Sequence, residues 1–338
     1  MGYKVAVIIG GGPAEREFSV RSGANISQAL QLMGHTVVVL DTTAELIPRL
    51  CEEAPDCAYI AIPGKQGESG AVQSVLEFVG IPFVGTPSAV CERTWNKFSL
   101  VDTLGSSHKA MGDFSQSYAV WPQGFCISRR VFEDLGAQSA LNVIEDNIRN
   151  YPVVVKPSRG VGAQGVHKVE SSEELFPAIV DVFAIDDHAV IQQWVSGVEL
   201  AVSVIDTPDG PVALPPVEIV PKAGWYDRAS RVDPSLVDYH APVRSQSLFP
   251  EEDGARLIRA QIEAAAVEVF QAYALRDLAR IDLIWDGSRA CVLEVNVAPN
   301  VTDVSMLPAA CRAAGLTFPG VLDMLVKQAV ERGVTSLG

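Results

Sequence analysis

The sequence predicts an α/β fold in which an N-terminal parallel sheet is followed by a part built on antiparallel strands. In the first hundred residues, short apolar runs rich in β-branched residues alternate with segments of helical spacing, which is the pattern of βαβ units. Further along, a loop carrying three glycines lies between two short apolar runs, as expected for an antiparallel hairpin. A second pair of apolar runs flanks the turn Asp286–Gly287, which predicts another hairpin.

Composition limits the class of protein. The chain has 338 residues, which suggests two or three domains, and 48% apolar with 20% charged residues excludes global disorder. The net charge is 26 − 41 = −15, so a nucleic-acid or anionic-membrane partner is not expected. No apolar stretch has the length of a membrane span, and the N-terminus is too short to be a signal peptide. We therefore expect a cytoplasmic protein.

The six cysteines form no CxxC pair and do not cluster with the five histidines. A zinc site or a disulfide framework is therefore not expected. The simplest interpretation is reduced thiols that pack in a cytosolic protein.

The N-terminal third supplies the parallel sheet. Strands are predicted at residues 4–9, 36–40, 58–62 and 82–85, and helices at 19–33 and 71–79. Ligands of such sheets bind beyond the carboxyl ends of the strands. Residues 10–19 and 64–70 should therefore lie on one functional edge.

The middle third begins with a broken polar stretch over residues 106–128 and a predicted helix over 137–150. Strands at 152–156 and 166–169 then flank the loop with Gly160, Gly162 and Gly165. Glycines in such a turn can lay backbone N–H groups against phosphates. The loop is not a GxxxxGK[ST] motif, and its strand context does not fit a dinucleotide-binding fingerprint.

The last third continues with strands. These are predicted at residues 189–195, 199–205, 212–219, 280–285 and 290–295. Residues 225–242 read as a long polar loop, 251–275 as an amphipathic helix and 318–332 as a closing helix.

The hairpin around Asp286–Gly287 carries the most informative side chains. Asp282 is near the start of its first strand and Glu294 near the end of its second, so the two carboxylates should lie close together. Asn296 is two residues beyond Glu294 and shares its face. Carboxylates among apolar neighbours need a partner, and Mg²⁺ between carboxylates and substrate phosphates is a common one. A hairpin with solvent-facing acids is the weaker interpretation.

Taken together, these motifs resemble the ATP-grasp superfamily and, more narrowly, the D-alanine–D-alanine ligase family. The resemblance covers nearly the whole chain, in order. It is carried by GGGPAEREFSVRSG, PGKQGESGAVQSVLEFVGIPFVG, WNKFSL, VVVKPSRGVGAQGV, IQQWVSGVELAVSV, ARIDLIWD, LEVNVAPNVTDVSMLP and AAGLTF. Ordered motifs of this length are specific as a set.

The resemblance implies a three-domain enzyme, with a Rossmann-like domain over 1–96, a central ATP-grasp subdomain over 97–190 and a C-terminal one over 191–338. Such an enzyme uses ATP, with Mg²⁺ or Mn²⁺, to convert one amino acid carboxylate into an acyl phosphate, which the amine of a second amino acid attacks. For D-alanine the product would serve peptidoglycan precursor synthesis. The resemblance also implies a homodimer.

Roles toward ATP and metal follow by position. Lys97 and Lys156 match the lysines that hold the ATP phosphates, and Gly160 and Gly162 lie in the matching loop. The adenine segment matches Gln192, Gln193, Trp194 and Val195. Glu199 matches the ribose-binding acid. The Mg²⁺ ligands match Asp282, Glu294 and Asn296.

Roles toward the amino acids follow in the same way. Arg280 matches the arginine that stabilises the transferred phosphoryl group. Glu15 matches the acid that binds the first ammonium group. Ser305 and Met306 match the segment that recognises the second carboxylate. The remaining assigned positions are Glu68 and Arg231 for substrate binding and Asn300 beside the oxyanion.

The departures from the family pattern fall around the amino acid site. Pro63 replaces a histidine, Ser69 an aspartate, Gly162–Ala163 a serine pair, and Val232 the tyrosine of a mobile loop. Asn300 replaces a glycine, and since asparagine tolerates positive φ, the turn geometry could survive. The amino acid pair is therefore not fixed by the sequence.

Alternatives stay open. Arg228 and Arg231 could pair with an acidic substrate or with ATP phosphate, or be solvated loop charges. The enzyme could join a different amino or hydroxy acid pair, or the chain could be a non-catalytic nucleotide-binding protein. A nicotinamide-dependent dehydrogenase, suggested only by GGGPAERE, fits least because GxGxxG is absent.

Overall fold

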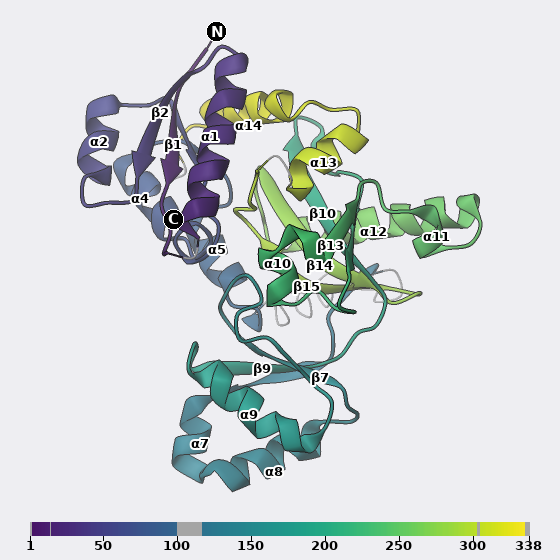
Figure 1. The fold of residues 1–338 in the computed structure, drawn as a ribbon. Helices are drawn as coiled ribbons and strands as arrows, with labels where there is room; N and C mark the ends of the chain where they lie inside the picture. The colour runs from purple at the N-terminus through teal and green to yellow at the C-terminus, as the bar shows by residue number, and fades with distance from the viewer. Residues whose placement is uncertain (1, 14, 100–116, 303–304, 335–338) are drawn as a thin grey trace.

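The computed structural model describes residues 2–13, 15–99, 117–302 and 305–334 (Figure 1). Its N-terminal sheet is parallel, with strand order β2-β1-β3-β4. The strands are β1 (Lys4–Ile9), β2 (Thr36–Asp41), β3 (Cys57–Ile60) and β4 (Phe83–Val84). The intervening helices are α1 (Arg16–Leu32), α2 (Leu46–Glu53), α3 (Lys65–Glu68) and α4 (Ala71–Val79), and α5 (Ser88–Trp95) follows the last strand.

Both faces of this sheet are covered, and β1 shows how. Its residues alternate between the two faces. Val5 and Val7 pack in the core that α1 shares with α13 (Met306–Ala313) and α14 (Phe318–Arg332). Ala6 and Ile8 pack against α2 and α4. The C-terminal helix therefore covers the N-terminal sheet (Figure 1).

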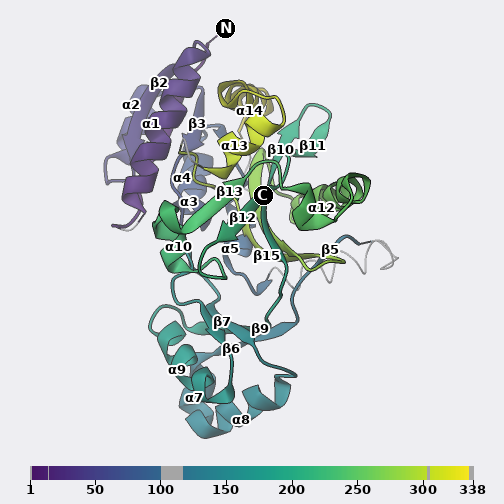
Figure 2. The same cartoon turned by 45° about the vertical axis from the view of Figure 1, so that its right-hand side comes forward.

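The central sheet is antiparallel, with order β6-β9-β7-β8. Its strands are β6 (Gly124–Ser128), β7 (Val153–Pro157), β8 (His167–Val169) and β9 (His188–Gln193). Helices α7 (Arg129–Leu135), α8 (Ala137–Asn147) and α9 (Ser172–Phe183) pack on one side of it, at the lower end of the molecule in Figure 2.

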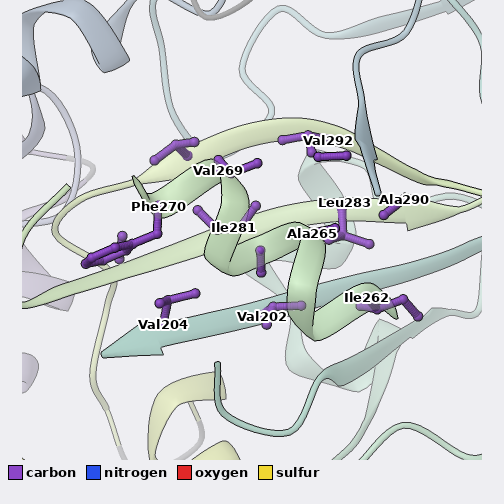
Figure 3. Close-up of a cluster of buried hydrophobic side chains, with 14 of the residues drawn as sticks. Val202, Val204, Ile262, Ala265, Val269, Phe270, Ile281, Leu283, Ala290 and Val292 are labelled. Carbon is purple, nitrogen blue, oxygen red and sulfur yellow. The ribbon is translucent and has the colours of Figure 1, made fainter. Parts of the chain in front are cut away.

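The largest sheet has seven strands, ordered β13-β12-β10-β14-β15-β5, with β11 paired to β10. They are β5 (Ala119–Val120), β10 (Val198–Thr207), β11 (Gly210–Ala213), β12 (Val217–Pro221), β13 (Val237–His240), β14 (Leu278–Trp285) and β15 (Ala290–Asn296). Helix α12 (Glu252–Ala272) covers one face, where Val269 and Phe270 lie over Ile281 (Figure 3). On the opposite face, Ile205, Val217 and Leu278 pack with α13 and α14, whereas Glu199 and Asp282 line a cavity.

Most elements expected from the sequence are confirmed to within a few residues, including both hairpins. The single strand expected at 212–219 is wrong, because Pro215 and Pro216 separate β11 from β12. The loop expected at 225–242 holds α10 (Arg228–Val232) and β13, and the turn at 64–70 holds α3. The broken stretch at 106–128 contains β5 and β6 from residue 119 onward, and its part before 117 lies outside the described residues.

The three sheets correspond broadly to the three predicted domains, although β9 crosses the boundary expected at 190/191 and β5 joins the C-terminal sheet. The domain division itself stays a prediction. Among the described helices, none alone has the length and apolar character of a membrane span. The bent pair α13 and α14 meets those two criteria only jointly, across an angle of 102°.

Candidate active site

Two adjoining cavities lie where the three sheets meet. The larger, of about 680 Å³, is lined by β7 and β9 of the central sheet and by β10, β12 and β14 of the large sheet. The smaller, of about 250 Å³, is lined by residues from the N-terminal part of the chain, by the glycine-rich loop, by α10 and by the end of β15. The residues that line both include Lys97, Gly160, Gln164, Arg231 and Glu294. Because the two cavities share these lining residues, a group bound in one cavity lies next to a group bound in the other.

Lys97 and Lys156 bring positive charge to that wall. Lys97 follows α5, and its Nζ donates a 2.6 Å hydrogen bond to the Gly160 carbonyl while lying 3.6 Å from Glu294 Oε2. Lys156 is buried on β7. Burial, together with the charge of Lys97, lowers the pKa of Lys156 to about 8, although Glu294 opposes the shift. The sequence placed both lysines at one site, and both line the larger cavity.

The glycine-rich loop between β7 and β8 has the backbone conformation its composition suggests. Gly162 and Gly165 have φ of 63° and 68°, in the left-handed region. Ala163 between them also has positive φ, at 55°. Gly160 and Gly162 line the smaller cavity, and Ala163 lines the larger. The loop thus places backbone along both.

The predicted adenine segment and Glu199 line the larger cavity. The segment comprises Gln192, Gln193, Trp194 and Val195, at and after the end of β9. The Trp194 ring has Lys168 Nζ 4.8 Å from its centre and the Trp225 ring edge-to-face at 6.0 Å. Burial raises the pKa of Glu199 to about 7, while Arg231 opposes the shift. The larger cavity is therefore lined by the aromatic rings of Trp194 and Trp225 and by the carboxyl group of Glu199.

The hairpin carboxylates adopt the predicted arrangement. Asp282 and Glu294 are direct partners across β14 and β15, and Arg280 is the partner of Asn296. Arg280 Nε and Nη2 donate to the two oxygens of Asp282 at 2.6 and 2.8 Å. Burial raises the pKa of Asp282 against the opposing charge of Arg280.

Glu294 is surrounded by cations. Lys97 lies 3.6 Å and Arg231 Nη1 3.7 Å from its carboxylate oxygens. Burial would raise the pKa of Glu294, but Lys97, Arg231, Lys156 and Arg280 together lower it to about 2. Glu294 is therefore fully ionised and lies in the wall between the cavities.

The donor chemistry of Asp282, Glu294 and Asn296 fits Mg²⁺. Two carboxylates and one amide supply only oxygen donors, and Mg²⁺ in such sites is held by one or two carboxylates together with substrate phosphates. Within the described residues, no group of three His, Cys, Asp or Glu side chains could hold a metal. The third donor here is an amide, so metal binding at this hairpin would depend on Asn296.

Several positions where the chain departs from the family pattern line the smaller cavity. They are Pro63, Gly162, Val232 and Asn300. Glu15 lines it as well, at the start of α1 and beside Gly64, whose φ is 84°. The departures predicted from sequence to surround one site are thus adjacent in space.

Arg228 and Arg231 both line the smaller cavity but differ in their surroundings. Arg231 stacks on the Tyr226 ring at 4.4 Å and faces Glu294, so the interpretation of a solvated loop charge is wrong for it. Arg228 is exposed. Only Arg231 therefore belongs to the charge cluster.

The loop after β15 is organised differently from the expectation. The described non-glycine residues with positive φ are Ala54, Ala163, Ala274 and Asp277, so Asn300 does not use that conformation. Its Oδ1 instead accepts from the Ser22 hydroxyl. Ser305 caps α13 and its hydroxyl lies 2.8 Å from that of Thr302, whereas Met306 lines the smaller cavity. Met306 thus lies at the predicted substrate position more directly than the Ser305 side chain.

Among the cavity residues that sequence reasoning missed are Gln164, Lys168 and Trp225. Gln164 lies inside the glycine-rich loop, where only the glycines gave a recognisable signal. Trp225 begins the polar segment after β12, and an aromatic residue there was a usable signal of an apolar contact. Lys168 is two residues into β8, and its contact with Trp194 depends on pairing between distant strands.

Comparison with known proteins agrees with this architecture. The family model "D-ala D-ala ligase C-terminus" matches residues 128–327. The chain is 33% identical to the D-alanine–D-alanine ligase of Desulforudis audaxviator, covering 97% of this chain and 99% of that protein. It is 31% identical to the ligase of the same name from Desulforamulus reducens, covering 98% and 100%.

Solved structures show the same fold. D-alanine–D-alanine ligase from Bacillus anthracis in complex with ATP superimposes with a TM-score of 0.74 at 23% identity, covering 98% of both chains. The VanG D-Ala:D-Ser ligase from Enterococcus faecalis gives a TM-score of 0.78 at 21% identity, covering 97% of this chain and 100% of that one.

Proposed function

The chain belongs to the D-alanine–D-alanine ligase family, and from this premise we propose that it joins two molecules of D-alanine at the expense of ATP. A carboxylate oxygen of the first D-alanine attacks the γ-phosphorus of ATP, and ADP leaves. The amine of the second attacks the carbonyl carbon of the resulting acyl phosphate. Inorganic phosphate leaves with the C–O bond electrons, and the amine loses a proton as the peptide bond forms.

In this proposal, ATP occupies the larger cavity. Adenine lies along Gln192–Val195, and the ribose hydroxyls donate to Glu199. Lys97 and Lys156 hold the phosphates, because each can bring a cation to the wall between the cavities. Asp282, Glu294 and Asn296 would hold Mg²⁺, or Mn²⁺ in its place. The bound ion supplies charge neutralisation at the transferring phosphoryl group.

The amino acids occupy the smaller cavity. Glu15 accepts hydrogen bonds from the ammonium group of the first D-alanine, and the segment at Met306 receives the carboxylate of the second. Arg280 stabilises the transferring phosphoryl group and then the oxyanion, a role that suits a rigidly held guanidinium. Asn300 lies beside that position.

One observation carries the proposal. The cavity of about 680 Å³ and the cavity of about 250 Å³ share a wall in which Lys97, Arg231 and Glu294 meet. A nucleotide-sized space thus adjoins a space for small substrates, with the charged groups between them. Phosphoryl transfer from one ligand to the other needs this arrangement.

The proposal is tested by supplying purified protein with Mg-ATP and a panel of D- and L-amino acids and D-lactate. Phosphate release and the coupled products are followed, the latter by mass spectrometry. We expect D-alanine alone to release phosphate and to yield D-alanyl-D-alanine. Turnover only with another pair would replace D-alanine with that pair, an outcome to which Pro63, Gly162, Val232 and Asn300 in the smaller cavity would point.

Tight ATP binding without turnover of any pair would overturn the ligase assignment in favour of a non-catalytic nucleotide-binding protein. A homodimer and a cytoplasmic location, both implied by the family, also stay proposals. Sedimentation velocity of the purified protein measures the first, and cell fractionation the second.

A further inference from the structure

Glu68 belongs to the N-terminal domain, yet its carboxylate lies against the C-terminal hairpin. It ends α3, and its side chain folds back so that Oε1 accepts a 2.7 Å hydrogen bond from the Gly64 N–H. Only 6% of the residue is exposed. The side chain is therefore held by its own short helix in one orientation.

The other partner of Glu68 is the Asn296 amide. The orientation of that amide follows from its neighbours, as usual for asparagine. With nitrogen toward Glu68, the amide N–H groups donate to Oε2 at 2.8 Å and Oε1 at 3.2 Å, and the amide oxygen accepts from Arg280 Nη2 at 2.6 Å. The reverse orientation would set oxygen against carboxylate and N–H against guanidinium, so Glu68 and Arg280 together select one state.

A continuous hydrogen-bond chain results. Glu68 accepts from the Gly64 N–H and from the Asn296 amide N–H groups. Arg280 Nη2 then donates to the Asn296 amide oxygen and, at 2.8 Å, to Asp282 Oδ2. The first two members of this hydrogen-bond chain come from the N-terminal domain and its last three from β14 and β15. The hydrogen bonds thereby connect residues of the N-terminal part to the guanidinium and to the hairpin oxygens.

We propose that Glu68 is a positioning residue that fixes the amide of Asn296 and, through it, the guanidinium of Arg280. Glu68 also lines the smaller cavity, so the direct substrate-binding role expected from the sequence stays a prediction. The positioning role is separate from it, because it acts through the hydrogen bonds that Glu68 accepts from Asn296. The inference rests on the proposed function for the roles of Asn296 and Arg280, but the geometry of the chain does not.

The test compares Glu68→Ala with Glu68→Gln and with Glu77→Ala. Glu77 is a matched control, because it is a buried glutamate of the neighbouring helix α4 whose carboxylate accepts from Ser88, with 2.9 Å to the Ser88 N–H, and not from Asn296. Two quantities are measured for each variant: the affinity for Mn²⁺ in the presence of ADP, by electron paramagnetic resonance, and kcat for phosphate release with D-alanine.

We expect Glu68→Ala to weaken Mn²⁺ affinity and to lower kcat, each by about 10–100-fold, as for loss of a group that orients a metal ligand. Glu68→Gln should recover only part of both, since its amide oxygen can accept from Gly64 and Asn296 whereas its NH2 group cannot accept the second hydrogen bond of Asn296. Glu77→Ala should lower thermal stability and leave both quantities unchanged. In a double-mutant cycle, Glu68→Ala should add little to Asn296→Ala, because the two act in series.

Unchanged Mn²⁺ affinity and kcat in Glu68→Ala would overturn the proposal, as would additive losses in the cycle or a Gln variant as defective as the Ala variant. Thermal melting shows that each variant is folded, and the near-isosteric Gln variant keeps the test usable if Ala unfolds. The metal readout needs no amino acid. Suppose that the wild-type protein shows no ligase activity but that Glu68→Ala still weakens its affinity for Mn²⁺. The proposed function would then be refuted, and this inference would stand.

Discussion

Asp282 and Glu294 are direct partners across β14 and β15, yet each carboxylate has its own nearest cation. Arg280 binds Asp282 through two hydrogen bonds, whereas Lys97 and Arg231 flank Glu294 at 3.6 and 3.7 Å. The two neighbouring carboxylates thus have different nearest cations, while Arg280 and Arg231 act on both, which offsets the cost of removing them from water. The charged groups of the site are thus concentrated at this hairpin, and we expect the loss of either carboxylate to lower turnover.

Replacing Glu294 with Gln removes the carboxylate that faces both cavities. We expect Mg²⁺-dependent phosphate release to fall by at least about 100-fold, because a charged oxygen donor is lost from the phosphoryl-transfer site. A titration of Mg²⁺ against phosphate release at saturating ATP measures this. Glu133→Gln, on an exposed position of α7, is the matched control and should behave as wild type. Undiminished Mg²⁺-dependent activity in Glu294→Gln would show the metal assignment to be wrong.

Replacing Arg280 with Lys keeps a positive charge but not the planar pair of donors that binds Asp282. We expect kcat to fall by about 100–1000-fold, with the dissociation constant of ATP changed far less, because the guanidinium acts on the transferring group. Steady-state kinetics and calorimetry separate the two quantities. Arg289→Lys, an exposed arginine of the β14–β15 turn, serves as the control. Equal losses in ATP affinity and kcat would instead make Arg280 a nucleotide-binding residue.

The lowered pKa of Lys156 predicts a pH dependence of ATP binding. Burial lowers this pKa to about 8, so the ammonium group is charged at neutral pH and loses its proton as the pH rises through 8. Since the charged form binds phosphate, ATP affinity should fall above pH 8 by about 10–100-fold, the strength of a charge-assisted hydrogen bond. Calorimetric titrations across this range measure the affinity. Lys156→Arg stays charged and should lose the dependence; an unaltered pH profile in that variant would assign the effect elsewhere.

An ion pair between the buried Asp277 carboxylate and the more exposed Arg332 links the N-terminal sheet to the C-terminal part. Arg332 of α14 donates to both oxygens of Asp277 at 2.7 and 2.8 Å and to the Phe83 carbonyl at 3.0 Å, while the Gly85 N–H donates to Asp277 at 2.7 Å. Arg332→Ala would remove two hydrogen bonds from the buried Asp277 carboxylate, which keeps Arg276 at 3.7 Å, so we expect a loss of about 2 kcal/mol in the free energy of unfolding.

Urea denaturation measures the stability of that variant. Lys327→Ala removes an exposed partner of Asp323 on the same helix and should cost less than about 1 kcal/mol. If the two variants lost similar amounts of stability, the Asp277–Arg332 pair would not hold the two parts together.

Local patterns in the sequence were sufficient for the hairpin and for most elements. The turn signal at Asp286–Gly287 and strand alternation predicted the hairpin and the proximity of Asp282 to Glu294. Their direct pairing also depends on a register shift between Asp282 and Leu283, which no local pattern indicated. The split of the strand expected at 212–219 was also legible, since Pro215 and Pro216 cannot continue a ladder. Helix α10 had a signal too, because Asp227 caps it through the Ser230 N–H.

Contacts between distant segments were not legible in this way. Lys97 reaches Glu294 only after the N-terminal part docks on the hairpin, and motif resemblance, not spacing, singled it out. Glu68 was recognised as part of a motif, but nothing in the spacing indicated Asn296 as its partner. Strand β13 forms by pairing with β12, and its polar local sequence gives no signal of a strand.

The central claim is that the carboxylate of one D-alanine is phosphorylated by ATP before the second D-alanine attacks. Purified protein supplied with Mg-ATP and D-alanine labelled with ¹⁸O at both carboxylate oxygens tests it directly. The account predicts D-alanyl-D-alanine together with ADP and inorganic phosphate, with one ¹⁸O atom in each phosphate released during coupling. Dipeptide formation with unlabelled phosphate, or with AMP and pyrophosphate in place of ADP and phosphate, would contradict it.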